Sequence, residues 1–314
     1  MARMHSKGQA MFRNLSLISV LLLGWASPAP ANAEIRIFAC EPEWAALARE
    51  IGGDKINAYS ATHEKQDPHH IRARPSLIAK IRRADLVFCS GAGLEIGWLP
   101  LLMQRGARAK IRPGTPGYFM AAQHVTVREK PTVVDRSMGD VHPDGNPHIH
   151  LDPRNILPIA RELVKRLSAI DPGNSAIFVK SLEIFGNEWA KNLKQWKEDI
   201  RGLKNMPVVV HHKSWSYLIG WIGLQEVGSL EAKPGIPPTA SHLQTLLKKA
   251  TTARTKAILR TPYDQAAPSK WLSKRTKIPA LVLPYTVPRD AKPGTLKGLF
   301  NDILVQLRQV NVSP

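Results

Sequence analysis

The stretch from Pro172 to Leu203, PGNSAIFVKSLEIFGNEWAKNLKQWKEDIRGL, predicts one long helix. Its apolar residues recur at steps of three and four, which is the period of a single helix face. These residues are Leu182, Phe185, Trp189, Leu193, Trp196, Ile200 and Leu203. Asp171 suits the N-cap, and Pro172 suits the first helical position, where no backbone N–H is needed. About 30 residues at about 1.5 Å each give a rod of about 45 Å. We therefore predict a bridging helix over residues 171–204, with an ordinary long core helix as the alternative.

The segments on both sides of this helix alternate between strand-like and helix-like patterns. Before it, we predict strands at 35–39, 55–60 and 85–88 and helices at 42–52, 75–84, 95–104 and 154–168. After it, we predict strands at 207–210, 225–229, 256–260 and 280–283 and helices at 214–222, 241–253, 268–276 and 296–310. Such alternation is typical of a parallel sheet covered by helices. We predict an α/β fold with two lobes, residues 34–170 and 205–314, each a mostly parallel sheet flanked by helices and joined by the long helix.

The first 33 residues have the features of an export signal. Three basic residues precede an apolar run at 15–26, and a small-x-small cleavage motif follows at 31–33. The apolar run is too short to span a bilayer comfortably. We therefore predict a signal peptide at residues 1–33 and a soluble mature protein of the periplasm that begins at Glu34. A lipoprotein signal ending at Cys40 is the alternative, because Ile-Phe-Ala-Cys before and at that position loosely resembles a lipidation box.

The chain of 314 residues carries a formal net charge of +19. Residues 1–33 hold three basic and no acidic residues, which leaves +16 for the remainder. Such an excess favours an anionic partner or surface. The basic residues are spread over helix-like segments such as 80–83 and 248–260, however, with no basic patch interleaved with aromatic residues. We predict a solvated basic surface and no nucleic-acid partner, with binding of an anionic ligand as an alternative.

Two cysteines, Cys40 and Cys89, remain in an exported chain. Each lies at the end of a predicted strand. If the two strands are parallel neighbours, their ends lie within reach of a disulfide, which an oxidising compartment permits. We predict this disulfide, with two buried free thiols or two thiolate metal ligands as the alternatives.

The distribution of histidines indicates a metal site. Ten histidines lie outside the predicted signal, and six of them form pairs: His69/His70, His148/His150 and His211/His212. Each pair lies at a predicted loop or strand end. Ligands bind parallel sheets beyond the carboxyl ends of the strands, and neutral imidazoles are ligands for Zn²⁺. We therefore predict a metal ion held between the two lobes.

Residues 112–147 are rich in Pro, Gly and polar residues, which predicts irregular structure. Within this segment, residues 137–145, SMGDVHPDG, have the composition of a mobile loop and contain Asp140, His142 and Asp144. The loop is either a lid that captures metal or a flexible segment with an unrelated histidine.

Three motifs resemble those of the solute-binding proteins of zinc and manganese ABC importers. Asp67-Pro68-His69, followed by Pro75-Ser76, resembles the DPH turn and PS pair of that family. Asn146–Pro153 resembles its NPHxWLDP turn, with His150 in the usual tryptophan place, and His212–Tyr217 resembles its HxxFxY motif. The motifs occur in family order around the long helix, and the resemblance covers essentially the whole mature chain. It implies a protein, expected to be a monomer, that captures a metal ion and delivers it to an ABC permease of the inner membrane.

By position, the resemblance carries metal ligands over to His69, His148 and His212. The fourth ligand of the family is usually an acid in an LDP turn after the penultimate strand, where this chain reads Leu-Pro-Tyr at 283–285. We predict Asp264 as the fourth ligand because it follows another strand end. The alternatives are Glu231, Asp290 and water.

Three imidazoles and one oxygen suit tetrahedral Zn²⁺, whereas Mn²⁺ prefers more carboxylate ligands. We therefore predict Zn²⁺, with Mn²⁺ as the alternative. Because imidazoles bind metal only when deprotonated, capture is expected to weaken below about pH 6. A zinc hydrolase is a rival, since an open fourth position can hold a nucleophilic water. The chain has no HExxH or GxSxG motif, so we predict that it is not an enzyme.

Overall fold

The computed structural model describes residues 1–2, 34–288 and 295–311. The predicted signal peptide, apart from its first two residues, and the candidate ligand Asp290 lie outside these ranges. The described residues from 34 onward belong to one compact unit. Within the described ranges, no helix is long and apolar enough to cross a membrane.

Four parallel strands form the first sheet, in the order β2-β1-β3-β4. They are β1 (Ile35–Ala39), β2 (Ile56–Ser60), β3 (Leu86–Cys89) and β4 (Tyr118–Met120). The first three strands are each followed by a helix: α1 (Pro42–Gly52), α2 (Pro75–Arg83) and α3 (Leu99–Gly106). Every residue of β3 is apolar and buried, as expected for a parallel strand covered on both faces.

Two details of this half differ from the sequence prediction. The three-residue strand β4 lies within the segment 112–147, which we expected to be irregular. Helix α3 begins at Leu99 instead of residue 95, because the chain makes a tight turn after β3. The carboxylate of Glu95 accepts hydrogen bonds from the backbone N–H groups of Ser90 and Gly91 and holds this turn.

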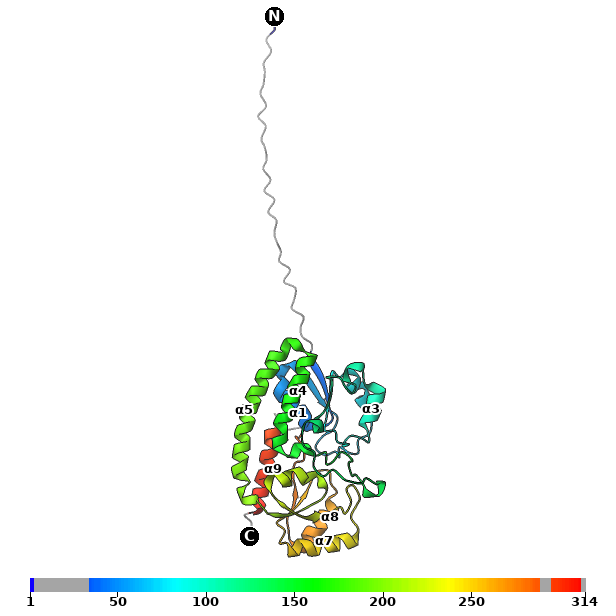
Figure 1. Cartoon of the computed structure of the whole chain (residues 1–314), viewed down its shortest axis with the longest axis vertical. Coiled ribbons are helices and arrows are strands. Elements are labelled where there is room, and N and C mark those ends of the chain that lie inside the picture. Colours follow the sequence, from blue (N-terminus) through cyan, green and yellow to red (C-terminus); the bar gives the residue numbers. More distant parts are fainter. Residues whose placement is uncertain (3–33, 289–294, 312–314) are drawn as a thin grey trace. The chain divides into compact units, whose positions relative to one another are not determined.

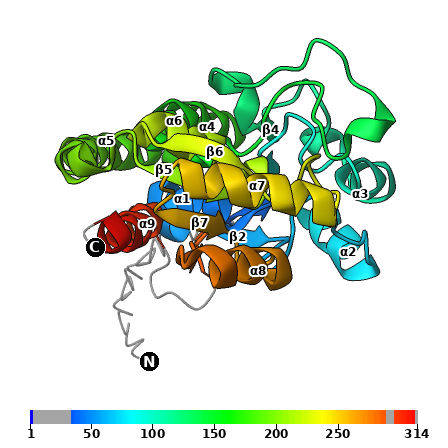
Figure 2. The same cartoon turned by 90° about the horizontal axis from the view of Figure 1, so that it is seen from below.

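The second sheet repeats the pattern of the first, in the order β6-β5-β7-β8, with all neighbours parallel. Its strands are β5 (Pro207–Val210), β6 (Gln225–Ser229), β7 (Ala257–Arg260) and β8 (Ala280–Val282). Its helices are α6 (Ser216–Ile222), α7 (Ala240–Thr252), α8 (Ala266–Thr276) and α9 (Leu296–Asn311). Helices α7 and α8 pack against each other at the far end of this half (Figure 2). The predicted α/β fold with two parallel sheets is confirmed.

The long helix is α5, a 25-residue α-helix from Ser175 to Asp199. The predicted range 171–204 was too wide for one α-helix, since 3-10 turns at Pro172–Asn174 and Arg201–Leu203 flank it. The side chain of Asp171 does not cap a backbone N–H but accepts a hydrogen bond from Asn174.

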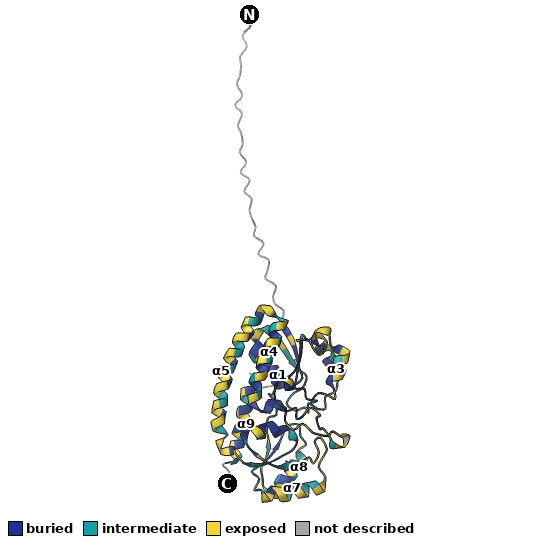
Figure 3. Ribbon diagram, in the orientation of Figure 1, coloured by how far each residue is buried: buried dark blue, intermediate teal, exposed yellow. Residues whose placement is uncertain are grey.

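Helix α5 packs against α1 and α4 (Ile156–Ile170) of the first half and against α9 near the second sheet (Figure 1). Its buried face includes Phe185, Trp189 and Trp196, as the spacing predicted, and its other faces are largely exposed (Figure 3). The indole N–H of Trp196 donates to Asn301 of α9 at 2.8 Å. The helix therefore links the two halves through a continuous aromatic core. The predicted lobe boundaries stay a prediction.

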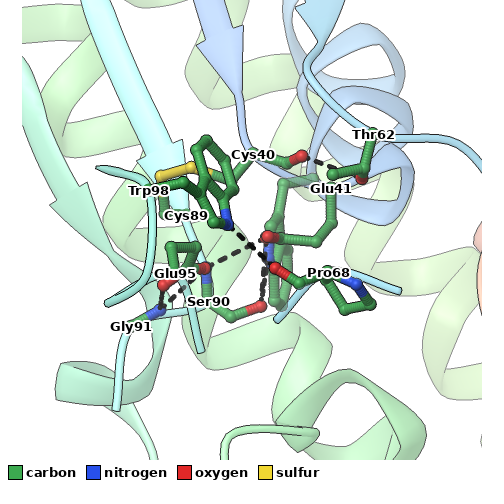
Figure 4. Close-up of a disulfide and its surroundings, with 10 residues drawn as sticks. Cys40, Glu41, Thr62, Pro68, Cys89, Ser90, Gly91, Glu95 and Trp98 are labelled. Carbon is green, nitrogen blue, oxygen red and sulfur yellow. Dashed lines mark hydrogen bonds between the residues drawn. A yellow bond between two sulfur atoms is a disulfide. The ribbon is translucent and has the colours of Figure 1, made fainter. Parts of the chain in front are cut away.

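The predicted disulfide joins Cys40, just after β1, to Cys89, the last residue of β3 (Figure 4). Their Cα atoms are 4.8 Å apart because β1 and β3 are parallel neighbours. Both residues are fully buried within the sheet. Because the two sulfur atoms are bonded to each other, both thiol alternatives are wrong. The bond also leaves no thiol at Cys40 to carry a lipid, which disfavours the lipoprotein alternative.

Candidate metal centre

Three histidines from separate parts of the chain meet at one point. His69 lies in the turn after β2, His148 precedes a 3-10 turn at Ile149–Leu151, and His212 follows β5. Each offers a ring nitrogen, and these three atoms all lie within 4.8 Å of one another. All three side chains are buried. The structure thus brings together the three histidines that the motifs singled out.

Each of these rings has its Nδ1 atom held by another side chain. Nδ1 of His69 lies 2.7 Å from Asp67 Oδ1, and Nδ1 of His212 lies 2.8 Å from Glu231 Oε2. Nδ1 of His148 lies 2.7 Å from the hydroxyl of Tyr285. Partners of this kind fix the tautomer and the orientation of metal-binding imidazoles. The arrangement leaves Nε2 of all three rings for a shared ligand.

Both carboxylates in this arrangement are ionised at neutral pH. Burial alone would raise the pKa of Glu231, but hydrogen bonds from His211 and His212 outweigh it and lower the pKa to about 2. Burial also opposes ionisation of Asp67, yet the hydrogen bond and charge of His69 lower its pKa. An ionised carboxylate accepts the Nδ1–H of the ring and so keeps the lone pair on Nε2.

The rings differ in their pKa values, and therefore in how strongly a proton competes with metal for each ring. Burial, followed by the neighbouring imidazoles, holds the pKa of His148 well below its usual value, so this ring is neutral at pH 7. Burial would also lower the pKa of His212, but the hydrogen bond and charge of Glu231 outweigh it and raise that pKa. Protons therefore compete with metal more strongly at His212 than at His148.

A fourth imidazole approaches the site from the loop at 137–145. Nε2 of His142 lies 3.2 Å from Nε2 of His69, and the two rings stack. Burial, with the charges of His69 and His212, lowers the pKa of His142 to about 4. This ring is therefore neutral and in its metal-binding form at pH 7. The loop histidine therefore lies beside His69, although its ligand atoms are not among those that converge within 4.8 Å in the described ranges.

The loop is held in place by the second half of the chain. The N–H of Asp140 donates to the carbonyl of Pro234 at 2.8 Å, and Lys233 Nζ donates to the carbonyl of Ser137 at 2.7 Å. Gly139 has a φ of 77°, and a Cβ there would collide with the carbonyl oxygen of Pro234. A cavity of about 220 Å³ beneath the loop is lined by His142, His148 and His212 among others.

The acidic candidates lie around the histidines and not among them. Asp264 closes the turn after β7: its Oδ2 accepts from the N–H of Thr261 at 2.7 Å, and its N–H donates to the hydroxyl of that residue. Its ligand atoms are not among those within 4.8 Å of the three rings in the described ranges, although its charge acts on His212. Glu231 binds His212 through Nδ1, on the side of the ring away from Nε2.

Sequence reasoning missed the roles of Tyr285 and His150. Tyr285 lies in the turn after β8, and its hydroxyl binds Nδ1 of His148 at 2.7 Å. His150 is fully buried; its Nε2 donates to the carbonyl of Tyr285 at 2.9 Å, and its Nδ1 lies 3.2 Å from Glu43 on α1. The one signal in the sequence was the absence of the tryptophan that the family motif places at 150. His150 therefore holds the backbone of Tyr285, whose hydroxyl in turn binds His148.

Known proteins resemble this chain over most of its length. The profile of the family described as "Zinc-uptake complex component A periplasmic" matches residues 37–309. The manganese ABC transporter substrate-binding lipoprotein PsaA of Streptococcus mitis is 24% identical over 290 residues, which cover 89% of this chain and 91% of that protein. The metal ABC transporter substrate-binding lipoprotein ScbA of Streptococcus cristatus is 25% identical over 267 residues, which cover 83% of both proteins.

Solved structures share the fold. The crystal structure of ZnuA has a TM-score of 0.71 at 20% identity, over 88% of this chain and 98% of that chain. The Mn-bound periplasmic metal binding protein from Candidatus Liberibacter asiaticus has a TM-score of 0.70 at 16% identity, over 88% of this chain and 100% of that chain. At such identities these two comparisons establish the fold alone. The profile match over most of the sequence shows that the chain belongs to the zinc-uptake component A family of ABC-importer substrate-binding proteins, which bind a metal and are not enzymes.

Proposed function

We propose that this chain is an exported zinc-binding protein of the periplasm. It captures Zn²⁺ with His69, His148 and His212 and delivers the ion, as a monomer, to an ABC permease of the inner membrane. The observation that carries the proposal is the convergence of three buried imidazoles whose Nδ1 atoms are each held by another side chain. Such a set is preorganised to offer three Nε2 lone pairs to one cation.

The donor set favours zinc over manganese. The relatives include proteins named for manganese, whose ion prefers oxygen ligands. Here the atoms that converge within 4.8 Å are imidazole nitrogens, and both neighbouring carboxylates are bound to the far side of a ring. Three nitrogens and one further ligand form the tetrahedral shell that Zn²⁺ adopts.

His142 is the strongest candidate for the fourth position. A zinc ion with Zn–N bonds of about 2.0–2.1 Å needs neighbouring nitrogens about 3.3 Å apart, and Nε2 of His142 already lies 3.2 Å from Nε2 of His69. Asp264 remains the carboxylate alternative, although its carboxylate also holds the turn at Thr261. With His142 as a ligand, metal binding would fasten the 137–145 loop over the site.

Zinc titration of the chelator-treated protein, in competition with a fluorescent zinc chelator, tests the proposal. We expect one tight zinc per chain and far weaker binding of Mn²⁺. The triple variant H69A/H148A/H212A should lose this binding, whereas H63A, which removes a histidine outside the site, should keep it. Retention of tight zinc binding by the triple variant would refute the proposal. Tighter binding of Mn²⁺ than of Zn²⁺ by the unaltered protein would mean that manganese is the metal captured.

Two single variants then assign the fourth ligand. We expect H142A, which removes a ligand, to weaken zinc binding by at least the roughly 10- to 100-fold seen for loss of an outer-shell partner, and D264N to leave it nearly unchanged. The reverse result would assign the position to Asp264. If neither variant has an effect, water completes the shell. Anomalous scattering at the zinc edge from a soaked crystal provides an independent view of every ligand.

A further inference from the structure

A second pocket lies at the opposite edge of the second sheet from the histidines. His212 follows the carboxyl end of β5, whereas this pocket lies where β7 and β8 begin. Its volume is about 520 Å³, within the range of small-ligand sites. The carboxyl-terminal ends of α7 and α8 form its walls, and Val310 of α9 contributes to the lining. Figure 1 places α7 and α8 at the end of the structure away from the first sheet.

The pocket and its surroundings are strongly positive. Arg254, Lys256 and Lys277 line it, and no acidic residue does. Five more basic residues lie on or beside α7 and α8: Lys248, Lys249, Lys270, Lys274 and Arg275. Within the described ranges, none of these eight cations forms an ion pair. Asp264 is the single acid between residues 232 and 288, and it lies at the other edge of the sheet.

The ends of the two helices do not account for this charge. A helix C-terminus carries about half a negative charge, so α7 and α8 together offset about one cation. Several of their last carbonyl groups are also already satisfied, since the backbone N–H groups of Arg254, Thr255 and Lys277 donate to the carbonyls of Thr251, Ala250 and Ser273. A surplus of positive charge therefore remains around the pocket.

One polar group at the pocket has no partner. Thr255 is 6% exposed, and its hydroxyl forms no hydrogen bond with any described residue. The hydroxyls of the two neighbouring threonines, Thr251 and Thr276, donate to carbonyls within their own helices. An unpaired buried hydroxyl is destabilising, so Thr255 marks a place where an acceptor from a ligand would stabilise the structure.

We propose that this pocket binds a phosphate-bearing anion. Arg254 can donate two parallel hydrogen bonds to phosphate oxygens, Lys256 and Lys277 add point charges, and the hydroxyl of Thr255 can donate one more bond. The phosphate belongs either to a soluble anion or to the headgroup of an acidic phospholipid, since the recognition chemistry is the same. The site is separate from the metal centre and does not depend on the proposed zinc function.

Isothermal titration of chelator-treated full-length mature protein with inorganic pyrophosphate tests the site. We expect saturable binding that weakens at high salt because the interaction is between charges. The variant R254S/K277S should weaken binding by about tenfold for each cation removed, and T255V by a smaller factor. The matched control K270S/K274S removes the same charge from α8 outside the pocket and should change the affinity less than about twofold.

Flotation with phosphatidylglycerol vesicles, compared with phosphatidylcholine vesicles, identifies the source of the phosphate. Vesicle binding that pyrophosphate competes away assigns a lipid headgroup, and pyrophosphate binding without vesicle binding assigns a soluble anion. The triple variant H69A/H148A/H212A should bind the anion normally, so this proposal and the zinc proposal can fail separately. Absence of binding to both probes, or an equal weakening in K270S/K274S, would overturn it.

Discussion

The disulfide gives a prediction whose magnitude follows from its position in the chain. Cys40 and Cys89 are 49 residues apart in the sequence. Closing a loop of about 50 residues in the unfolded chain removes entropy worth about 4 kcal/mol at 25 °C in the chain-entropy description. We therefore expect the variant C40A/C89A to lose about 3–4 kcal/mol of unfolding free energy, a large share of the 5–15 kcal/mol typical of a domain.

Urea unfolding of the zinc-free protein, followed by tryptophan fluorescence, measures this loss. Wild-type protein reduced with dithiothreitol is the matched control, because it opens the same loop while keeping both sulfur atoms in the core. The dependence of the free energy on urea should also steepen, since an unfolded chain without the cross-link exposes more surface.

Zinc affinity separates two roles for the disulfide. Around the bond, the hydroxyl of Thr62 donates to the carbonyl of Cys40, and the indole N–H of Trp98 donates to the carbonyl of Pro68 beside His69 (Figure 4). If the bond acts on the unfolded chain, these hydrogen bonds survive and zinc affinity stays within about threefold. A loss of less than about 1 kcal/mol in stability, or a collapse of affinity in a folded variant, would refute the reasoning.

Three further changes have defined outcomes. E231Q should weaken zinc binding by about 10- to 100-fold, because a neutral amide supports the Nδ1–H of His212 less well than a carboxylate does. E226Q is the control, and equal zinc affinities of E231Q and E226Q would contradict the role assigned to Glu231. Burial raises the pKa of Glu95 to about 7, so the folded protein holds a proton that the unfolded chain releases near pH 4.3. This contribution to stability is full below that pH and is lost as the pH rises through 7, and it is on the order of 3 kcal/mol. Burial also raises the pKa of the neighbouring Glu41, so E95Q should make the fall smaller without removing it; an equally large fall in the variant and the wild type, measured by urea unfolding at a series of pH values, would disprove it. W196A should cost about 3–5 kcal/mol in thermal or urea unfolding, since it empties a buried site in the aromatic core, and a cost below about 1 kcal/mol would exclude a central role for this ring.

The parts that sequence predicts are those fixed by local pattern and by sheet topology. Helix α5 follows from its three-and-four spacing, and its ends differ only in the 3-10 turns. His69 follows β2 of the first sheet and His212 follows β5 of the second, each beyond the carboxyl end of its strand, where ligands bind parallel sheets. The disulfide follows in the same way, since it needed only that β1 and β3 be neighbours.

The parts that sequence does not predict depend on contacts between distant segments. Strand β4 is three residues in a segment rich in Pro and Gly, so no pattern could develop. Tyr285 binds a ring 137 residues away, and no local signal reports that contact. The position of His142 depends on how the loop docks on residues 233–235, nearly one hundred residues further along the chain. The fourth ligand belongs to this class, which is why Asp264 and His142 need a binding experiment to be told apart.

The packing of α5 bears on how cargo could leave. Trp196 stacks edge-on against Trp189 and lies near Phe300 of α9, with ring centres 5.2 Å apart in both cases. Rotating the two halves apart would expose these packed aromatic rings to water, and the free-energy cost would rise with each ring exposed. Peeling the 137–145 segment off Lys233 and Pro234 breaks two hydrogen bonds instead. A transporter that releases the metal from this protein would therefore need to displace the 137–145 loop while the two halves keep their relative positions.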